Sequence, residues 1–327
     1  NTLSYTTLFR SLLLLVVTGV LALMLGATNI APADIWGALV GDGRDTATVA
    51  IVRAVRLPRV LLAMLVGAAL GMSGSVLQGT LRNALAEPYL LGVSGGAAVG
   101  AVVAVAAGVG APPLIALAAF VGALGAVAAV LAIAHAAGGL GDTRLLLMSG
   151  VVVGAFANAA IMVVMAAAAP DVTRNALWWM MGSVAAAGWR DVVLLAAMLA
   201  VIGAWLVHQA RGLDVLALGG DAADSLGIDA ARVGRRFFVL ASLLAAATVA
   251  VAGLVGFVGL MVPHLARSIT GGRARPVLLA AALCGAILVV GADLAARTVR
   301  APAELPLGAV TALVGVPFFL WRLRGGR

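Results

Sequence analysis

Residues 59–81 read RVLLAMLVGAALGMSGSVLQGTL, and residues 82–96, RNALAEPYLLGVSGG, follow them directly. The first stretch is long and apolar enough for a helix that crosses a bilayer, which takes about 20 residues. The second stretch brings Arg82, Asn83, Glu87 and Pro88 together, before residues 97–110 resume the apolar pattern. The alternation predicts an all-α polytopic membrane protein. The polar break is then either a tight turn at the membrane surface or a functional element.

The composition of the whole chain agrees with this reading. Of the 327 residues, 63% are hydrophobic and 10% are charged, and the mean hydropathy is +1.15. A soluble globular domain carries about 25% charged residues, so the chain falls in the membrane class. Glycines spaced four apart, at Gly67 and Gly71 and at Gly92, Gly96 and Gly100, predict helix faces that another helix approaches closely.

Nine apolar segments are candidate membrane spans, and a shorter helix over about 259–271 is the tenth. No polar or Pro-rich linker divides the chain, so we expect one transmembrane domain over residues 1–327. The nine candidate spans are about 8–28, 58–81, 89–108, 112–138, 145–169, 191–209, 235–256, 275–298 and 306–323.

The charged residues bear on both topology and function. The net charge is +8, and all 21 basic residues are arginines. A phosphate-binding P-loop needs a lysine, so any ATP must bind to another chain. The arginines are scattered between apolar runs, which favours membrane topology over nucleic-acid binding. With ten spans, thirteen arginines share the side of the N-terminus and eight lie opposite, which predicts two cytoplasmic termini.

Two polar segments interrupt the apolar pattern at opposite membrane faces. Residues 210–236 predict two short surface helices on the cytoplasmic side, with Asp221 capping a helix that runs through Ser225 and Asp229 capping the next. The alternative is an ordinary solvated loop. On the other side, TRNALWWMM, residues 173–181, predicts an interfacial helix. Its Arg174 either attracts an anionic solute or extends to the membrane surface.

Residues typical of catalysis or metal binding are sparse. The histidines lie far apart and Cys284 is the single cysteine, so we expect neither a metal site nor catalytic residues. His264 is expected to pack or to form a hydrogen bond. Asp293 and Arg297 stand four residues apart and predict an ion pair on one helix, with a proton relay as the alternative.

The order of the motifs closely resembles the permease subunits of bacterial ABC importers for iron chelates, haem and cobalamin, from about residue 50 to the C-terminus. The motifs that carry the resemblance are RLPRVLLAMLVGAALGMSGSVLQG, RNALAEPYLLGVSGGAAVG, GDTRLLLMSGV, LWWMMGS, LALGGDAADSLGID, GLVGFVGLMVPHLAR, ADLAART and APAELPLGAVTALVGVPFFLWRL.

The resemblance implies a type II importer permease with ten membrane helices in the bacterial inner membrane. It implies a homodimer, two separate ATPase subunits that hold ATP and Mg, and a periplasmic substrate-binding protein. It implies no cofactor in this chain and no nucleic-acid partner.

The resemblance also assigns site residues. Asn83, Leu85 and Thr143 match positions of the cytoplasmic gate, although Ala84 stands where the family pattern Asn-Pro-Leu-Ala-Glu-Pro has its first proline. The positions that dock the binding protein match Arg56, Arg59 and Arg297. Within about 214–232, the helices that contact the ATPase match Gly219, Gly220, Asp221, Ala222, Ser225, Leu226 and Gly227.

The expected function is ATP-driven import of haem or another iron chelate, such as a ferric siderophore, from periplasm to cytoplasm. Arg174 at the periplasmic mouth would suit an anionic substrate. A cobalamin importer of the same family is the alternative. An ion-coupled secondary transporter would need buried acids at mid-membrane, whereas Asp191 and Asp293 lie towards helix ends. An integral membrane enzyme would need a nucleophile–base set, which these motifs do not supply.

Overall fold

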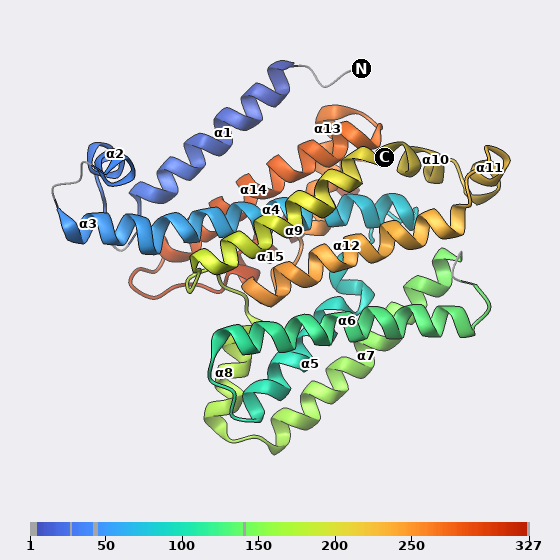
Figure 1. Cartoon of the computed structure of the whole chain (residues 1–327), viewed down its shortest axis with the longest axis horizontal. Coiled ribbons are helices and arrows are strands. Elements are labelled where there is room, and N and C mark those ends of the chain that lie inside the picture. Colours follow the sequence, from blue (N-terminus) through green and yellow to red (C-terminus); the bar gives the residue numbers. More distant parts are fainter. Residues whose placement is uncertain (1–4, 27, 42–44, 140–141, 326–327) are drawn as a thin grey trace.

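A computed structural model describes residues 5–26, 28–41, 45–139 and 142–325. Every regular element in this part is helical (Figure 1). The elements are α1 (Tyr5–Met24), α2 (Pro32–Val40), α3 (Thr46–Ala50), the π-helix η1 (Ile51–Arg56), α4 (Leu57–Thr80), the 3₁₀-helix η2 (Pro88–Leu91), α5 (Val93–Ala106), α6 (Pro112–Ala136), α7 (Thr143–Ala167), α8 (Pro170–Met180), α9 (Trp189–His208), α10 (Ala210–Ala217), α11 (Gly220–Ser225), α12 (Ala230–Ala252), α13 (Val258–Thr270), α14 (Ala274–Thr298) and α15 (Leu307–Gly325).

The long helices run between two ends of the molecule (Figure 1). The short helices α2 and α8 lie at one end, called the α8 end below. The short helices α10 and α11 lie at the other, called the α11 end. Each predicted span contains one α-helix, and the span 89–108 is divided between η2 and α5. Among the described residues, six helices are long and apolar enough to cross a membrane. Shorter apolar helical segments lie in α1, α5 and α15.

The second predicted span begins earlier than expected. Helix runs without interruption over Thr46–Thr80, through α3, η1 and α4, and not only over 58–81. The start is set by Asp45, whose carboxylate accepts hydrogen bonds from the backbone N–H groups of Ala47 (3.1 Å) and Thr48 (3.2 Å). Arginines 53, 56 and 59 therefore lie on a helix and not in a loop.

Helix α4 forms the centre of the bundle and packs most extensively against α14. At this crossing, a Cβ atom placed on Gly67 would lie 2.0 Å from the carbonyl oxygen of Gly285. A second close approach joins α5 to α6, where a Cβ on Gly100 would lie 2.1 Å from the carbonyl oxygen of Ala118. The predicted glycine faces are confirmed, and they explain why the sequence is rich in small residues.

Two helices, α5 and α13, are too short to cross a bilayer alone. Helix α13 follows five non-helical residues, 253–257, that break the path of α12. Phe257 in this break has a φ of +66°, a left-handed conformation that is uncommon for a residue with a side chain. Backbone N–H and C=O groups at such a break must find partners elsewhere in the protein.

Candidate functional site

The polar turn, defined here as residues 82–87, follows α4 at the α11 end. Its shape comes from its own residues. Arg82 has a left-handed φ of +47°, and the Asn83 Oδ1 atom accepts a hydrogen bond from the backbone N–H of Leu85 at 2.9 Å. The Leu85 side chain is 51% exposed. The turn therefore presents an apolar side chain outward from a hydrogen-bonded base.

The polar turn lies beside the α10–α11 connection. Arg82 and Thr143 line a groove of about 710 Å³ together with Leu218, Gly219, Gly220 and further residues at the start of α7. Of the three residues predicted to form a gate, Thr143 is in this lining, whereas Asn83 and Leu85 are not. The groove places the short surface helices in contact with the region of the polar turn.

The two short surface helices, α10 and α11, are confirmed. The predicted capping by Asp221 is wrong, because α11 begins at Gly220 after Gly219, whose φ of +114° requires glycine. The side chain of Asp221 lies outside the described part of the structure. Asp229 does cap α12, because its Oδ1 atom accepts from the backbone N–H of Arg232 at 2.8 Å.

At the α8 end, Arg59 is held by two carboxylates. Its guanidinium donates to Asp293, with Nη2 at 2.8 Å from Oδ1, and to Glu304, with Nη1 at 2.7 Å from Oε1. The Asp293 side chain is buried, whereas that of Glu304 is 40% exposed. The hydrogen bonds from Arg59 lower the pKa of the Glu304 carboxyl below its ordinary value. Arg297 completes the cluster at 3.6 Å from Asp293, which confirms the predicted i,i+4 pair.

Arg56 and Arg297 also form hydrogen bonds with the C-terminal carbonyl groups of α1. Arg56 donates to the carbonyl oxygens of Leu23 (2.6 Å) and Met24 (2.9 Å), and Arg297 donates to that of Ala22. The last carbonyls of a helix lack partners within the helix and carry partial negative charge, so cations suit them.

All three arginines predicted to dock a binding protein are thus buried and engaged within the chain. Docking through these residues remains a prediction. Arg174 on α8 is exposed at the same end.

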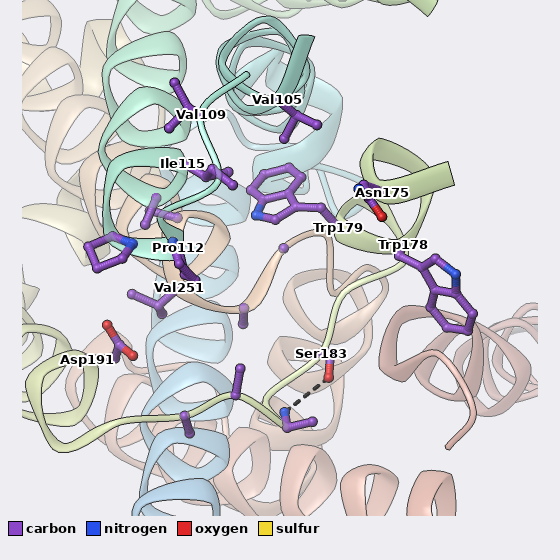
Figure 2. A pocket seen from close by; sticks show the side chains of 18 of the residues that line it. Val105, Val109, Pro112, Ile115, Asn175, Trp178, Trp179, Ser183, Asp191 and Val251 are labelled. Carbon is purple, nitrogen blue, oxygen red and sulfur yellow. Dashed lines mark hydrogen bonds between the residues drawn. The ribbon is translucent and has the colours of Figure 1, made fainter. Parts of the chain in front are cut away.

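At the same end, a cavity of about 460 Å³ lies among the ends of α5, α6, α8, α9 and α12, and its lining includes Asn175, the next residue after Arg174. Figure 2 shows its mostly apolar wall, with Trp179 reaching across it towards Ile115, and with Asn175, Ser183 and Asp191 among its polar side chains. Among the residues that the structure describes, no group of three or more His, Cys, Asp or Glu could hold a metal ion. The cavity suits an apolar group and offers few polar contacts.

Comparison with known proteins identifies the family. Residues 14–325 match the model of the FecCD transport family. The chain belongs to the FecCD transport family. It is 37% identical to the hemin transport system permease protein of Yersinia pestis, over 95% of this chain and 92% of that protein. It is 42% identical to the cobalamin import system permease protein of Halobacterium salinarum, over 86% of this chain and 74% of that protein.

A solved structure supports the same assignment. A metal-chelate type ABC transporter in an inward-facing conformation superposes with a TM-score of 0.88 and 28% identity, covering 97% of this chain and 98% of its own. The FecCD-family chain is therefore a multi-pass permease subunit of an ABC importer in the inner membrane, and the ATPase is a separate component.

The structure also reveals polar contacts that the sequence did not. Glu87, Tyr89 and His264 join the polar turn and η2 of this FecCD-family permease to the segment around α13. A signal was present, since Glu87 lies inside a polar break and His264 follows a proline within an apolar run. The partners are separated by at least 166 residues in the chain, so spacing alone could not pair them.

Proposed function

We propose that two copies of this chain form the pathway of an importer that carries haem or another iron chelate from periplasm to cytoplasm. The observation that carries the proposal is the 37% identity to a hemin permease over 92% of that protein's length. A cobalamin importer is the alternative, because cobalamin permeases are similar to this chain to a comparable degree, one with 42% identity over 74% of its length and another with 41% identity over 89% of its length.

The α11 end is proposed to face the cytoplasm, with both termini on that side. ATP and Mg would bind to partner ATPase subunits, and this chain would hold no cofactor. The exposed Leu218 and Leu226 flank α11 and offer apolar contacts to such a partner. Movement of α10 and α11 would be transmitted to Thr143 and the polar turn, because residues of α11, of its connection to α10 and of the polar turn line one groove with Thr143. Asn83, Leu85 and Thr143 would form the gate.

At the α8 end, a periplasmic binding protein would deliver the substrate. The exposed Arg174 would attract an anionic substrate to the mouth of the pathway, near the apolar cavity of Figure 2. Glu304 is the exposed member of the arginine cluster, so docking at Arg56, Arg59 and Arg297 would require rearrangement of their internal contacts.

An ion-coupled mechanism fits less well. Asp293 is a buried acid, but it accepts hydrogen bonds from Arg59 and pairs with Arg297. Both of its carboxylate oxygens are thus engaged by guanidinium groups of the same chain, whereas a coupling site would need an acid that is free to bind the transported ion.

The proposal is tested by uptake into proteoliposomes that contain the permease, its ATPase and its binding protein. Haem, a ferric siderophore and cobalamin are offered separately. We expect uptake of haem or the siderophore that requires both ATP and the binding protein. Uptake of cobalamin alone would select the alternative, and uptake driven by a proton gradient without ATPase would overturn the ABC mechanism for this chain.

Changing Leu226 to arginine is expected to reduce the ATPase that copurifies with the permease by more than about tenfold. Leu226 is 62% exposed, so the fold tolerates the change, whereas one central interface contact is worth 2 kcal/mol or more, about 30-fold in affinity. Pull-down from detergent extracts measures the loss. The control is Val299→Arg, at an apolar position of the α8 end that is 73% exposed. Equal losses in both variants, or no loss in Leu226→Arg, would contradict the assigned interface.

A further inference from the structure

The polar turn and η2 are attached to the segment that begins α13. The Glu87 carboxylate accepts a hydrogen bond from the backbone N–H of Phe257 at 2.7 Å, and the Tyr89 hydroxyl accepts one from the N–H of Val255 at 2.7 Å. Both donors lie in the break between α12 and α13, where backbone groups lack helical partners. Glu87 also places an acid at the positive end of α13.

His264 makes a third attachment, to the middle of the polar turn. Its Nε2 atom lies 3.0 Å from the carbonyl oxygen of Ala84, which can only accept, so the ring nitrogen donates. The contact lies between the two predicted gate residues Asn83 and Leu85. On its other side the imidazole meets the ring of Phe319 on α15, edge to face at 5.9 Å between centroids.

A fourth attachment joins α13 to the last turns of α4. Pro263 has no N–H, so the carbonyl of Gly259 loses its helical partner. The Gln78 side chain donates to that carbonyl at 3.4 Å and to the carbonyl of Leu260 at 3.2 Å. The Gln78 Oε1 atom accepts a hydrogen bond from Arg267 of α13. Helix α13 and the break before it are thus bonded to the chain before, within and after the polar turn.

The break before α13 is also the natural place for it to pivot. The end of α12 is fixed, because Ser183 donates from its backbone N–H to the carbonyl of Ala252 at 2.8 Å. Residues 253–257 beyond it are non-helical and include the left-handed Phe257. Hinges are short non-helical or helix-terminal segments that absorb backbone rotation.

We propose that α13 positions the polar turn and that His264 is the positioning residue, so that the turn moves with α13 as one body. The inference rests on the proposed function, in which the polar turn is the inner gate. His264 itself touches no substrate in this scheme. Its hydrogen bond to Ala84 sets the position of the neighbouring Leu85. Its ring contact with Phe319 places the same imidazole against α15.

Two substitutions separate the hydrogen bond from the ring contact. His264→Phe keeps an aromatic ring against Phe319 and removes the donor to Ala84. His264→Gln keeps a donor and removes the ring. Cys284 is the single cysteine of the chain, so Cys284→Ala with Leu85→Cys leaves one exposed thiol on the polar turn as a reporter.

The experiment uses the reconstituted complex of permease and ATPase, and a water-soluble fluorescent maleimide as the probe. The labelling rate of the reporter is measured without nucleotide and with ATP and Mg. We expect ATP to change the rate in the parent and in His264→Gln. In His264→Phe the ATP-induced change should shrink about two- to tenfold, the range that one hydrogen bond can bias a two-state equilibrium.

The outcomes distinguish this inference from the function on which it rests. If ATP does not change the labelling rate of the parent, the gate assignment is wrong and this inference is wrong with it. A parent that responds, together with an equal response in His264→Phe, would overturn the inference alone. If both variants lose the response and their melting temperatures fall together, His264 serves only the fold and the inference is wrong.

Discussion

Replacing Gly285 with valine is expected to abolish the folded permease. A Cβ atom at this position would lie 2.1 Å from the carbonyl oxygen of Gly67, and the reverse contact at Gly67 is equally short. Both obstacles are backbone atoms inside helices, so no side chain can move aside. Overpacking a core costs about 1–3 kcal/mol where side chains can adjust, and separating α4 from α14 costs more.

The measurement is the yield of monodisperse Gly285→Val protein after detergent extraction and size-exclusion chromatography. The matched control is Gly291→Val on the same helix, where an added Cβ meets no atom within 4 Å. Both substitutions carry the same change in helix propensity, so only packing differs between them. Comparable monodisperse yields would show that α4 and α14 do not cross as closely as described.

Changing Asp293 to asparagine is expected to destabilise the protein by about 3–5 kcal/mol, the cost of removing one partner from a buried ion pair. The substitution preserves the shape of the side chain and removes its charge. Arg59 would then keep only its ion pair with Glu304, and Arg297 would keep its hydrogen bond to the Ala22 carbonyl. The guanidinium groups of Arg56, Arg59 and Arg297 would still be buried together. Unfolding in mixtures of detergent and dodecyl sulfate, followed by circular dichroism, measures the difference.

The control is Glu304→Gln, which removes the other carboxylate that Arg59 contacts. Glu304 is 40% exposed, so its pair is worth no more than about 1 kcal/mol. Because Arg59 lowers the folded-state pKa of Glu304, the contribution is present above the ordinary glutamate pKa. It is lost as the pH falls through the lowered value, so this variant and the parent should converge in acid. Equal costs for the two substitutions at neutral pH would contradict the burial of Asp293.

Much of the architecture could be predicted from the sequence, because membrane helices are read from local hydropathy. The apolar runs mark the helices, and Asp229 marks the start of α12 as predicted. The start of the α3–α4 run at residue 46 was missed, because its first turns mix polar and apolar residues. The cap predicted at Asp221 is wrong because Gly219, two residues earlier, occupies the N-cap position of α11.

The sequence by itself determined that this chain spans a membrane, where its apolar spans lie and which glycine faces bring helices together, since these depend on residues a few positions apart. Only the tertiary structure decided that Arg59 is paired with Asp293 and Glu304, and that α13 is attached to the polar turn through Glu87 and His264. The physical reason is that a buried charge or an unpaired backbone group needs a partner, and the fold supplies that partner from residues 170 to 245 positions away.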